Sequence, residues 1–370
     1  MTEREAYVAF NLTDRIGSVG VGVLAERYGS VAAAWENYPE KVSRQGSDVD
    51  WKEEFAKARR YGVTILTPVD EGYPPLLKKT RGHPLALYVK GDVKVLGEPA
   101  VAIVGTRRAT AYGLDQSARF AHDLAQSGWC IVSGLALGID AEASRGALAA
   151  GGRAIGVLGT ALDRFYPEQN RELAREMVKK GGAVVSEFPF GRAPDQQTFP
   201  QRNHVVAALS SGVIAVEAPV KSGTLITTAI AADIGRVVMA VPGRVDSPRS
   251  AGCLSLIRDG ATLVRSADDV AEALSSLLPA KSLRKPHGAA RHAADSAEAS
   301  PAAPVAPVPK MSLEESMIMR ELDVGGITQD KLVERTGLSP QKVWSLTMTL
   351  RLKGRVRFLA GGRVAMPREI

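Results

Sequence analysis

Between Val101 and Val264, short apolar runs alternate with longer helix-like segments, and most of the runs end in glycine, hydroxyl or basic residues. Short runs rich in branched residues are typical of strands covered on both faces, and alternation with helices predicts a parallel, doubly wound sheet. We predict strands over 101–104, 130–132, 154–158, 183–186, 213–216 and 237–241. The expected fold class is therefore α/β, with a Rossmann-like, mostly parallel sheet.

Other stretches flank this central region and differ from it in composition. Residues 1–70 look helical, with Ile16–Gly22 as a glycine hairpin that either contacts a phosphate or only packs, as in small helix-hairpin-helix or sterile-alpha-motif-like (SAM-like) domains. The Rossmann-like domain is expected over 71–279. Residues 280–310 form an Ala/Pro-rich linker. Residues 311–370 predict three helices and a hairpin, which is the pattern of a winged helix-turn-helix domain.

Composition places limits on the partners of the chain. Its 370 residues are 45% hydrophobic and carry a formal net charge of +7. Residues 1–280 hold 32 basic and 31 acidic side chains, whereas residues 281–370 hold 15 and 9. A polyanion therefore meets a basic C-terminal segment but needs a local basic patch on the front portion. The charged N-terminus and the absence of a long apolar run predict a cytoplasmic protein without membrane insertion.

The predicted strand ends place turn, hydroxyl and basic residues on one rim of the sheet, where doubly wound folds bind their ligands. Five basic side chains are expected there: Arg107, Arg108, Arg202, Lys221 and Arg244. The segment Lys221–Thr224 precedes a helix, so that its backbone NH groups form a phosphate cradle beside a lysine. Phe199 offers a face for a nucleobase to stack on, although its spacing fits a core residue equally well.

The rim lacks the signatures of common nucleotide enzymes. Gly105 is followed by Thr106 and two arginines rather than by a dinucleotide fingerprint, and the chain has no Walker loop. Of the five histidines, only His204 is expected near the rim. Acids lie near the strand ends at Asp140, Asp163, Glu187 and Glu217. Such acids either supply catalytic carboxylates or cap helices and pair with arginines. We expect binding rather than catalysis, with no catalytic residue, cofactor or metal.

Seven ordered motifs resemble those of the DNA-processing protein A family (DprA, also called Smf), over about residues 73–264. They are Gly105–Arg107, Ser133–Asp140, Gly159–Pro167 with Asn170, Ser186-Glu187, Phe199–Asn203, Lys221–Thr224 and Pro242–Arg244. Two positions depart from the family pattern. Ser144 stands where a histidine is usual and Leu254 where an asparagine is usual, which leaves the roles of these two positions open.

The resemblance implies a bacterial cytosolic protein that binds single-stranded DNA during natural transformation, protects it and loads the RecA recombinase onto it. It also implies a homodimer formed through the Rossmann-like domain, with neither catalytic activity nor a cofactor. Single-strand-binding protein is a further candidate partner. The implied DNA groove consists of Gly105, Arg107, Ser133, Gly134, Phe199, Arg202, Asn203, Lys221, Ser222 and Gly223, and the chemistry of the rim adds Arg108 and Arg244.

Two other functions remain open. Rossmann-like nucleotide phosphoribohydrolases carry a similar glycine–threonine turn, but they need a glutamate after it, whereas Thr224 is followed by Leu225, Ile226 and Thr227. Alternatively, the C-terminal domain alone binds duplex DNA as a regulator, unless it docks a protein instead. As a duplex reader it would place Gln341, Lys342 and Ser345 near the bases and Arg355, Arg357 and Arg363 near phosphates.

Overall fold

The computed structural model divides into two compact units, Met1–Ala290 and Arg291–Ile370. The residues that it describes are 1–13, 16–39, 41, 48–195, 197–275, 313–322, 327–352, 356–359 and 363–366. The predicted linker over 280–310 lies outside them. Among the helices of the described ranges, none combines the length and the apolar character needed to cross a bilayer.

The larger unit is built on a nine-stranded sheet with the order β1-β2-β6-β5-β4-β3-β7-β8-β9. The strands are β1 Thr64–Leu66, β2 Leu87–Gly91, β3 Ala100–Val104, β4 Cys130–Ser133, β5 Ala154–Val157, β6 Ala183–Ser186, β7 Gly212–Ala215, β8 Val237–Ala240 and β9 Thr262–Leu263. Strand β2 runs antiparallel to both of its neighbours, and every other pairing in the sheet is parallel. The predicted α/β class and the six predicted strands are confirmed. Strands β1, β2 and β9 are additions.

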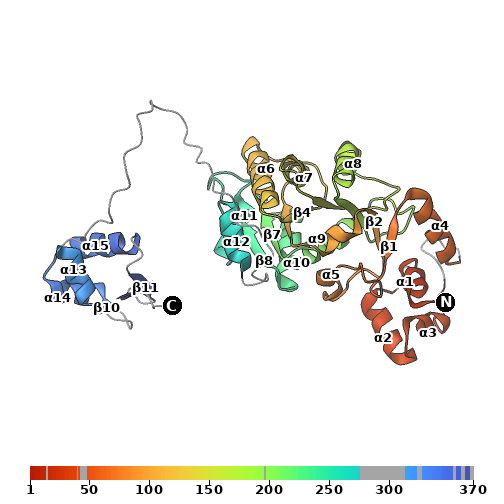
Figure 1. Ribbon diagram of the computed structural model, residues 1–370, viewed down its shortest axis with the longest axis horizontal. Coiled ribbons are helices and arrows are strands. Elements are labelled where there is room, and N and C mark those ends of the chain that lie inside the picture. The colour runs from red at the N-terminus through yellow and green to blue at the C-terminus, as the bar shows by residue number, and fades with distance from the viewer. Residues whose placement is uncertain are drawn as a thin grey trace. The chain divides into compact units, whose positions relative to one another are not determined.

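Helices cover both faces of this sheet (Figure 1). The helices and short 3-10 turns are α5 Pro75–Lys78, η1 Val93–Gly97, α6 Ala111–Gln126, α7 Ile139–Ala149, η2 Glu168–Asn170, α8 Arg171–Lys179, α9 Thr198–Ala208, α10 Gly223–Asp233, α11 Ala251–Arg258 and α12 Ala267–Leu274. On one face, side chains such as Phe120 of α6 and Met177 of α8 form an apolar core with the strands. On the other face, Leu77 of α5 and Val205 of α9 contribute to a second core. The strands are therefore buried on both sides, as their composition predicts.

The connectivity of the sheet places a crevice at its centre. From β3 the chain proceeds outward through β4, β5 and β6, and then returns to β7 on the other side of β3. Strand order thus reverses between β3 and β7. In open α/β sheets, the loops that leave the carboxyl ends of such strands diverge and form the ligand site.

The front of the larger unit contains four helices: α1 Glu3–Asn11, α2 Ser18–Tyr28, α3 Val31–Glu36 and α4 Trp51–Tyr61. The prediction of a glycine hairpin over 16–22 is wrong, because Gly20 and Gly22 lie within helix α2. Gly20 permits close packing, since a Cβ there would lie 2.7 Å from a side-chain carbon of Ile16. The side chain of Arg4 donates to the carbonyl oxygen of Ile65 in β1 at 2.7 Å, which links α1 to the sheet. A domain boundary at residue 70 stays a prediction.

The smaller unit contains the three helices and the hairpin that its sequence predicts. These are α13 Leu313–Arg320, α14 Gln329–Thr336 and α15 Pro340–Leu352, with strands β10 Ile327–Thr328, β11 Arg357–Leu359 and β12 Arg363–Ala365. The strands form an antiparallel sheet of order β10-β12-β11. Ile318, Leu332 and Val343, one from each helix, are fully buried in its core.

The close packing of α6 on α7 yields a stability prediction. A Cβ at Gly146 would lie 2.9 Å from Cα of Ala118 and closer still to its carbonyl oxygen. Overpacking costs about 1–3 kcal/mol, which outweighs a gain of at most about 1 kcal/mol in helix propensity. Gly146→Ala should therefore lower the free energy of unfolding by about 1–2 kcal/mol, measured by urea denaturation.

Gly22 provides the matched control, because it lies on the exposed side of α2 with no atom within 4 Å of a Cβ. Gly22→Ala should raise the free energy of unfolding by about 0.5–1 kcal/mol. A gain in both variants would contradict the packing argument.

Candidate functional site

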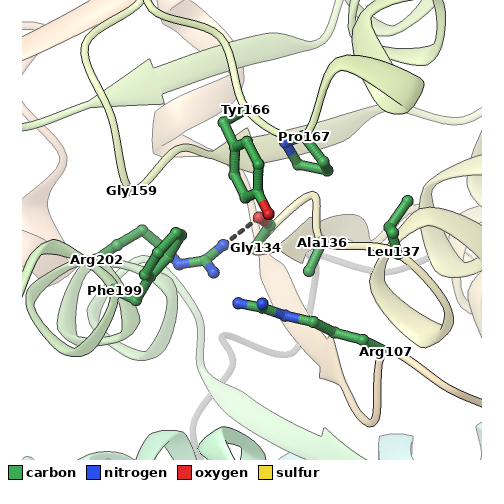
Figure 2. A pocket seen from close by; sticks show the side chains of 9 residues that line it. All are labelled: Arg107, Gly134, Ala136, Leu137, Gly159, Tyr166, Pro167, Phe199 and Arg202. Atoms are coloured by element: carbon green, nitrogen blue, oxygen red, sulfur yellow. Dashed lines mark hydrogen bonds between the residues drawn. The ribbon is translucent and has the colours of Figure 1, made fainter. Parts of the chain in front are cut away.

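A pocket opens at the carboxyl ends of β3, β4 and β5, beside the start of α9 (Figure 2). It is lined by Arg107, Gly134, Ala136, Leu137, Gly159, Tyr166, Pro167, Phe199 and Arg202. Four of the predicted site residues are among them: Arg107, Gly134, Phe199 and Arg202. Segments that are far apart in the sequence therefore meet at the central strands, where the topology predicts a ligand site.

Arg202 is the most constrained side chain of the pocket, with an exposed fraction of only 6%. Its guanidinium donates hydrogen bonds to the carbonyl oxygens of Gly134 and of Val157, the latter at 3.0 Å. Burial lowers the pKa of Arg202, and the nearby Asp140 carboxylate opposes that shift. A Cβ at Gly134 would collide with the guanidinium. Arg202 thus ties α9 to the ends of β4 and β5, and glycine at 134 makes room for it.

Arg107, in contrast, is exposed and lies on the turn after β3. Its guanidinium carbon is 5.3 Å from the centroid of the Phe199 ring, within cation–π range. Figure 2 shows the guanidinium groups of Arg107 and Arg202 pointing toward one another. In the part of the chain that the structure describes, Arg107 has no carboxylate partner. The pocket therefore presents uncompensated positive charge.

Tyr166 is a pocket residue that the sequence reasoning did not single out. Its side chain is exposed, and its ring centroid lies 6.1 Å from that of Phe199, with the ring planes tilted by 58°. Tyr166 belongs to the loop after β5, one of the loops expected at the carboxyl rim. Its place in this loop was the one feature of the sequence that could have identified Tyr166 as a site residue. With Phe199 it gives the pocket two aromatic rings beside two guanidinium groups.

The predicted phosphate cradle forms the N-terminus of α10. Ser222 is the N-cap, yet its hydroxyl makes no capping bond, and the first turn contains no acidic side chain. The Oγ atom of Ser222 is buried without a hydrogen-bond partner among the described residues. Lys221, Ser222 and Gly223 do not line the pocket. They adjoin α9, however, because Nδ2 of Asn203 lies 3.5 Å from the Gly223 carbonyl oxygen.

Two predicted contacts have structural roles instead of facing the pocket. Ser133 is fully buried, and its hydroxyl lies 3.1 Å from Oγ of Ser144 and accepts a hydrogen bond from the Leu135 NH. Gly105 packs against α7, since a Cβ there would lie 2.5 Å from Ile139 Cγ1. Ser133 and Gly105 are therefore engaged in packing and hydrogen bonding within the protein. Ser144, one of the departures from the family pattern, completes this buried network.

The two outer arginines also lie away from the pocket. Arg108 is exposed and does not line it. Arg244 is exposed and forms a two-pronged ion pair with Asp246, at 2.8 and 2.9 Å. Such an exposed pair contributes little to stability, so that Arg244 can exchange its carboxylate partner for another anion at low cost.

Three of the four acids at the strand ends, Asp140, Asp163 and Glu217, accept hydrogen bonds from backbone or hydroxyl groups. Glu217 accepts hydrogen bonds from the NH and hydroxyl of Thr110, and Asp163 accepts one from the Gly191 NH. Asp140 accepts one from the Gly134 NH. His204 does not line the pocket. Its Nε2 lies 3.3 Å from the Thr80 hydroxyl oxygen, and burial lowers its pKa.

The structure describes some of the candidate duplex contacts in the smaller unit. Lys342 is exposed and forms an ion pair with Glu314 at 2.5 Å. Ser345 is exposed on α15. The remaining candidates are placed as follows: Gln341 in α15, Arg357 in β11, Arg363 in β12, and Arg355 outside the described residues.

Family models match most of the chain. Residues 64–275 match the model of DNA recombination-mediator protein A, and residues 297–362 match that of the DprA winged helix domain. The C-terminal unit is therefore a winged helix. Among curated proteins, Smf of Synechocystis is 35% identical over 294 residues, covering 75% of this chain and 74% of that protein. DprA of Bacillus subtilis is 39% identical over 221 residues, covering 60% and 74%.

The solved structures that are similar to the chain include two DprA proteins. DprA from Streptococcus pneumoniae has a TM-score of 0.62 and 33% identity, covering 74% of this chain and 98% of that one. DprA from Helicobacter pylori has a TM-score of 0.52 and 31% identity, covering 58% and 96%. Both proteins are therefore similar to this chain in sequence as well as in fold.

The contrast between the two arginines of the pocket gives a second prediction. In Arg202→Lys, the shorter side chain does not bring its ammonium to the position of Nη1, from which Arg202 donates to both carbonyl oxygens, so that buried polar groups lose partners. We expect the free energy of unfolding to fall by about 2–3 kcal/mol. Arg107→Lys changes an exposed group, and should alter the free energy of unfolding by less than about 0.5 kcal/mol. Chemical denaturation of both variants measures the difference, and similar values would contradict it.

Proposed function

The chain belongs to the DNA recombination-mediator protein A family, and we propose that it binds single-stranded DNA as a mediator of recombination. The observation that carries the proposal is that the exposed guanidinium of Arg107, which faces the buried Arg202, shares one pocket with the Phe199 and Tyr166 rings. Guanidinium groups attract phosphates, and aromatic rings stack on bases. A single strand offers both groups, whereas a duplex hides its base faces. The H. pylori relative, whose structure concerns single-stranded DNA binding, supports this assignment.

We propose that the strand continues from the pocket to the start of α10. The contact between Asn203 and Gly223 makes the two regions neighbours, and the uncapped NH groups after Ser222 suit a phosphate. Lys221 would neutralise the same phosphate. Arg108 and Arg244 are proposed as outer contacts, because both are exposed. Gly105, Ser133 and Gly134 are proposed to act by shaping the turns.

Within this function, we propose that the chain protects incoming DNA and loads RecA during natural transformation, acting in the cytoplasm as a homodimer formed through its Rossmann-like domain. Single-strand-binding protein is proposed as a further partner. The role is proposed to be non-enzymatic. In support, the described lining of the pocket includes no histidine and no carboxylate, so that it offers neither a general base nor a metal ligand of these types.

Duplex DNA is proposed as the ligand of the winged helix. The match to the winged helix model and the excess of basic residues beyond residue 280 support this. Lys342 would exchange Glu314 for a phosphate or a base edge on binding. The wing arginines, Arg355, Arg357 and Arg363, are proposed to contact the backbone of the duplex.

Salt dependence tests the binding of the single strand. Each phosphate contact contributes about 0.7 to the slope of log affinity against log salt for single strands. Arg107→Ala should therefore weaken oligothymidylate binding severalfold and lower the slope by about 0.7, and Lys221→Ala should do the same. Fluorescence anisotropy across a salt series measures both quantities.

Arg175→Ala is the control, since it removes an exposed arginine of α8 that is paired with Glu172 and lies outside the pocket. Its affinity and slope should match those of the unaltered protein. Unchanged slopes in Arg107→Ala and Lys221→Ala would count against the proposal.

The aromatic contribution can be separated from the ionic one. Phe199→Leu should weaken oligothymidylate binding by about 1–3 kcal/mol through lost stacking, and leave the salt slope unchanged. Phe165→Leu is a close control, because Phe165 is also half-buried and lies 5.3 Å beneath an arginine, Arg171, but outside the pocket. Equal losses in the two variants would refute a stacking role for Phe199.

A further inference from the structure

We propose that two buried carboxylates, Asp140 and Glu217, are positioning residues that hold the Arg107 turn, residues 105–110, in place for the DNA strand. The inference rests on the proposed function. Neither acid lines the pocket, and each is almost fully buried, with exposed fractions of 5% and 3%. They follow the two strands that flank β3, which places one on each side of the turn.

Asp140 holds the first part of the Arg107 turn. It lies in the first turn of α7, and its Oδ2 accepts a hydrogen bond from the Gly134 NH at 2.9 Å. Burial raises the pKa of this carboxyl group, and the charge of Arg202 together with the nearby backbone NH groups of the two turns opposes that rise. The preceding residue, Ile139, donates its NH to the Thr106 carbonyl oxygen at 3.4 Å, so that the start of α7, which Asp140 bonds to the turn after β4, also contacts the turn after β3.

Glu217 holds the other end of the turn. Its two carboxylate oxygens accept hydrogen bonds from the Thr110 NH at 2.9 Å and from the Thr110 hydroxyl at 2.6 Å. Its backbone carbonyl oxygen accepts one from the Thr106 NH at 2.8 Å. Gly113 makes room for this carboxylate, because a Cβ there would lie 2.5 Å from Cδ of Glu217.

This arrangement fixes the backbone on both sides of Arg107 and leaves its side chain exposed. Buried carboxylates are unfavourable unless they are fully bonded, and these two direct their bonds to the NH and hydroxyl groups of the turns. They therefore do not form an ion pair with Arg107. A turn that is already ordered loses little conformational entropy when its arginine meets a phosphate. Asp140 and Glu217 thus hold the turn that carries Arg107 without neutralising the charge of its guanidinium.

Asp140→Ala and Glu217→Ala in the full chain test the proposal. Oligothymidylate binding is measured across a salt series, well below the melting temperature of each variant. Each variant should bind about threefold to tenfold more weakly and lose about 0.7 of the salt slope, as Arg107→Ala does. In an Arg107→Ala background, Glu217→Ala should cause less than about a twofold further loss, because the contact it supports is already absent.

Glu54→Ala is the matched control. Glu54 is another buried carboxylate, 3% exposed, that accepts a backbone hydrogen bond, from the Phe190 NH at 2.9 Å, but it lies on α4. The Glu54→Ala variant should be less stable than the unaltered protein, yet keep the same oligothymidylate affinity and the same salt slope. If alanine prevents folding at either position, Asp140→Asn and Glu217→Gln are judged by the same criteria.

The outcomes separate the two proposals. If the unaltered chain does not bind the oligonucleotide, or Arg107→Ala does not alter binding, the proposed function fails. If those results hold but the Asp140 and Glu217 variants keep full affinity and slope despite lower melting temperatures, both acids are merely structural and the inference is overturned. A full further loss from Glu217→Ala in the Arg107→Ala background would overturn it as well.

Discussion

The burial of one guanidinium organises the site. A charge this far from water needs bonded partners, and Arg202 has them in the Gly134 and Val157 carbonyl oxygens and in the charge of Asp140. These partners fix the start of α9 over the ends of β4 and β5. Phe199 lies three residues earlier, one helical turn away on the same face, and is thereby directed into the pocket toward Arg107. The contact between the Phe199 ring and the Arg107 guanidinium therefore depends on the buried side chain of Arg202.

The sequence was sufficient to predict the central sheet, because strands buried on both faces must be apolar along their whole length. The location of the site followed from topology, since the loops after parallel strands share one rim. Strands β1 and β9 are too short for a periodic signal, and β2 is buried only in its first half. The sequence predicts a turn at the glycines of α2 because glycine favours turns in isolation. Packing against Ile16 is a tertiary effect that local propensity does not contain.

The roles of individual site residues were harder to predict than their grouping. Arg202 and Arg107 look alike in sequence, yet one is a buried brace and the other an exposed cation, and the difference arises from how α9 packs on the sheet. The strand-end acids were left between catalysis and capping. For Asp140 and Glu217, the structure shows hydrogen bonds to backbone groups, and those bonds join residues that are 6 and 107 positions apart. Tyr166 lies in a loop without periodicity, so that its place in a loop at the carboxyl rim was the one sequence signal for it.

The reversal of strand order between β3 and β7 has a consequence for how the molecule is made. One wall of the pocket comes from the loop after β3, and the opposite wall from α9, which is synthesised only after β6. A nascent chain emerging from the ribosome contains Arg107 long before Phe199, and the start of α10 comes later still. The pocket is therefore complete only once the second half of the sheet has joined the first, and under the proposed function an unfinished chain would not capture nucleic acid through it.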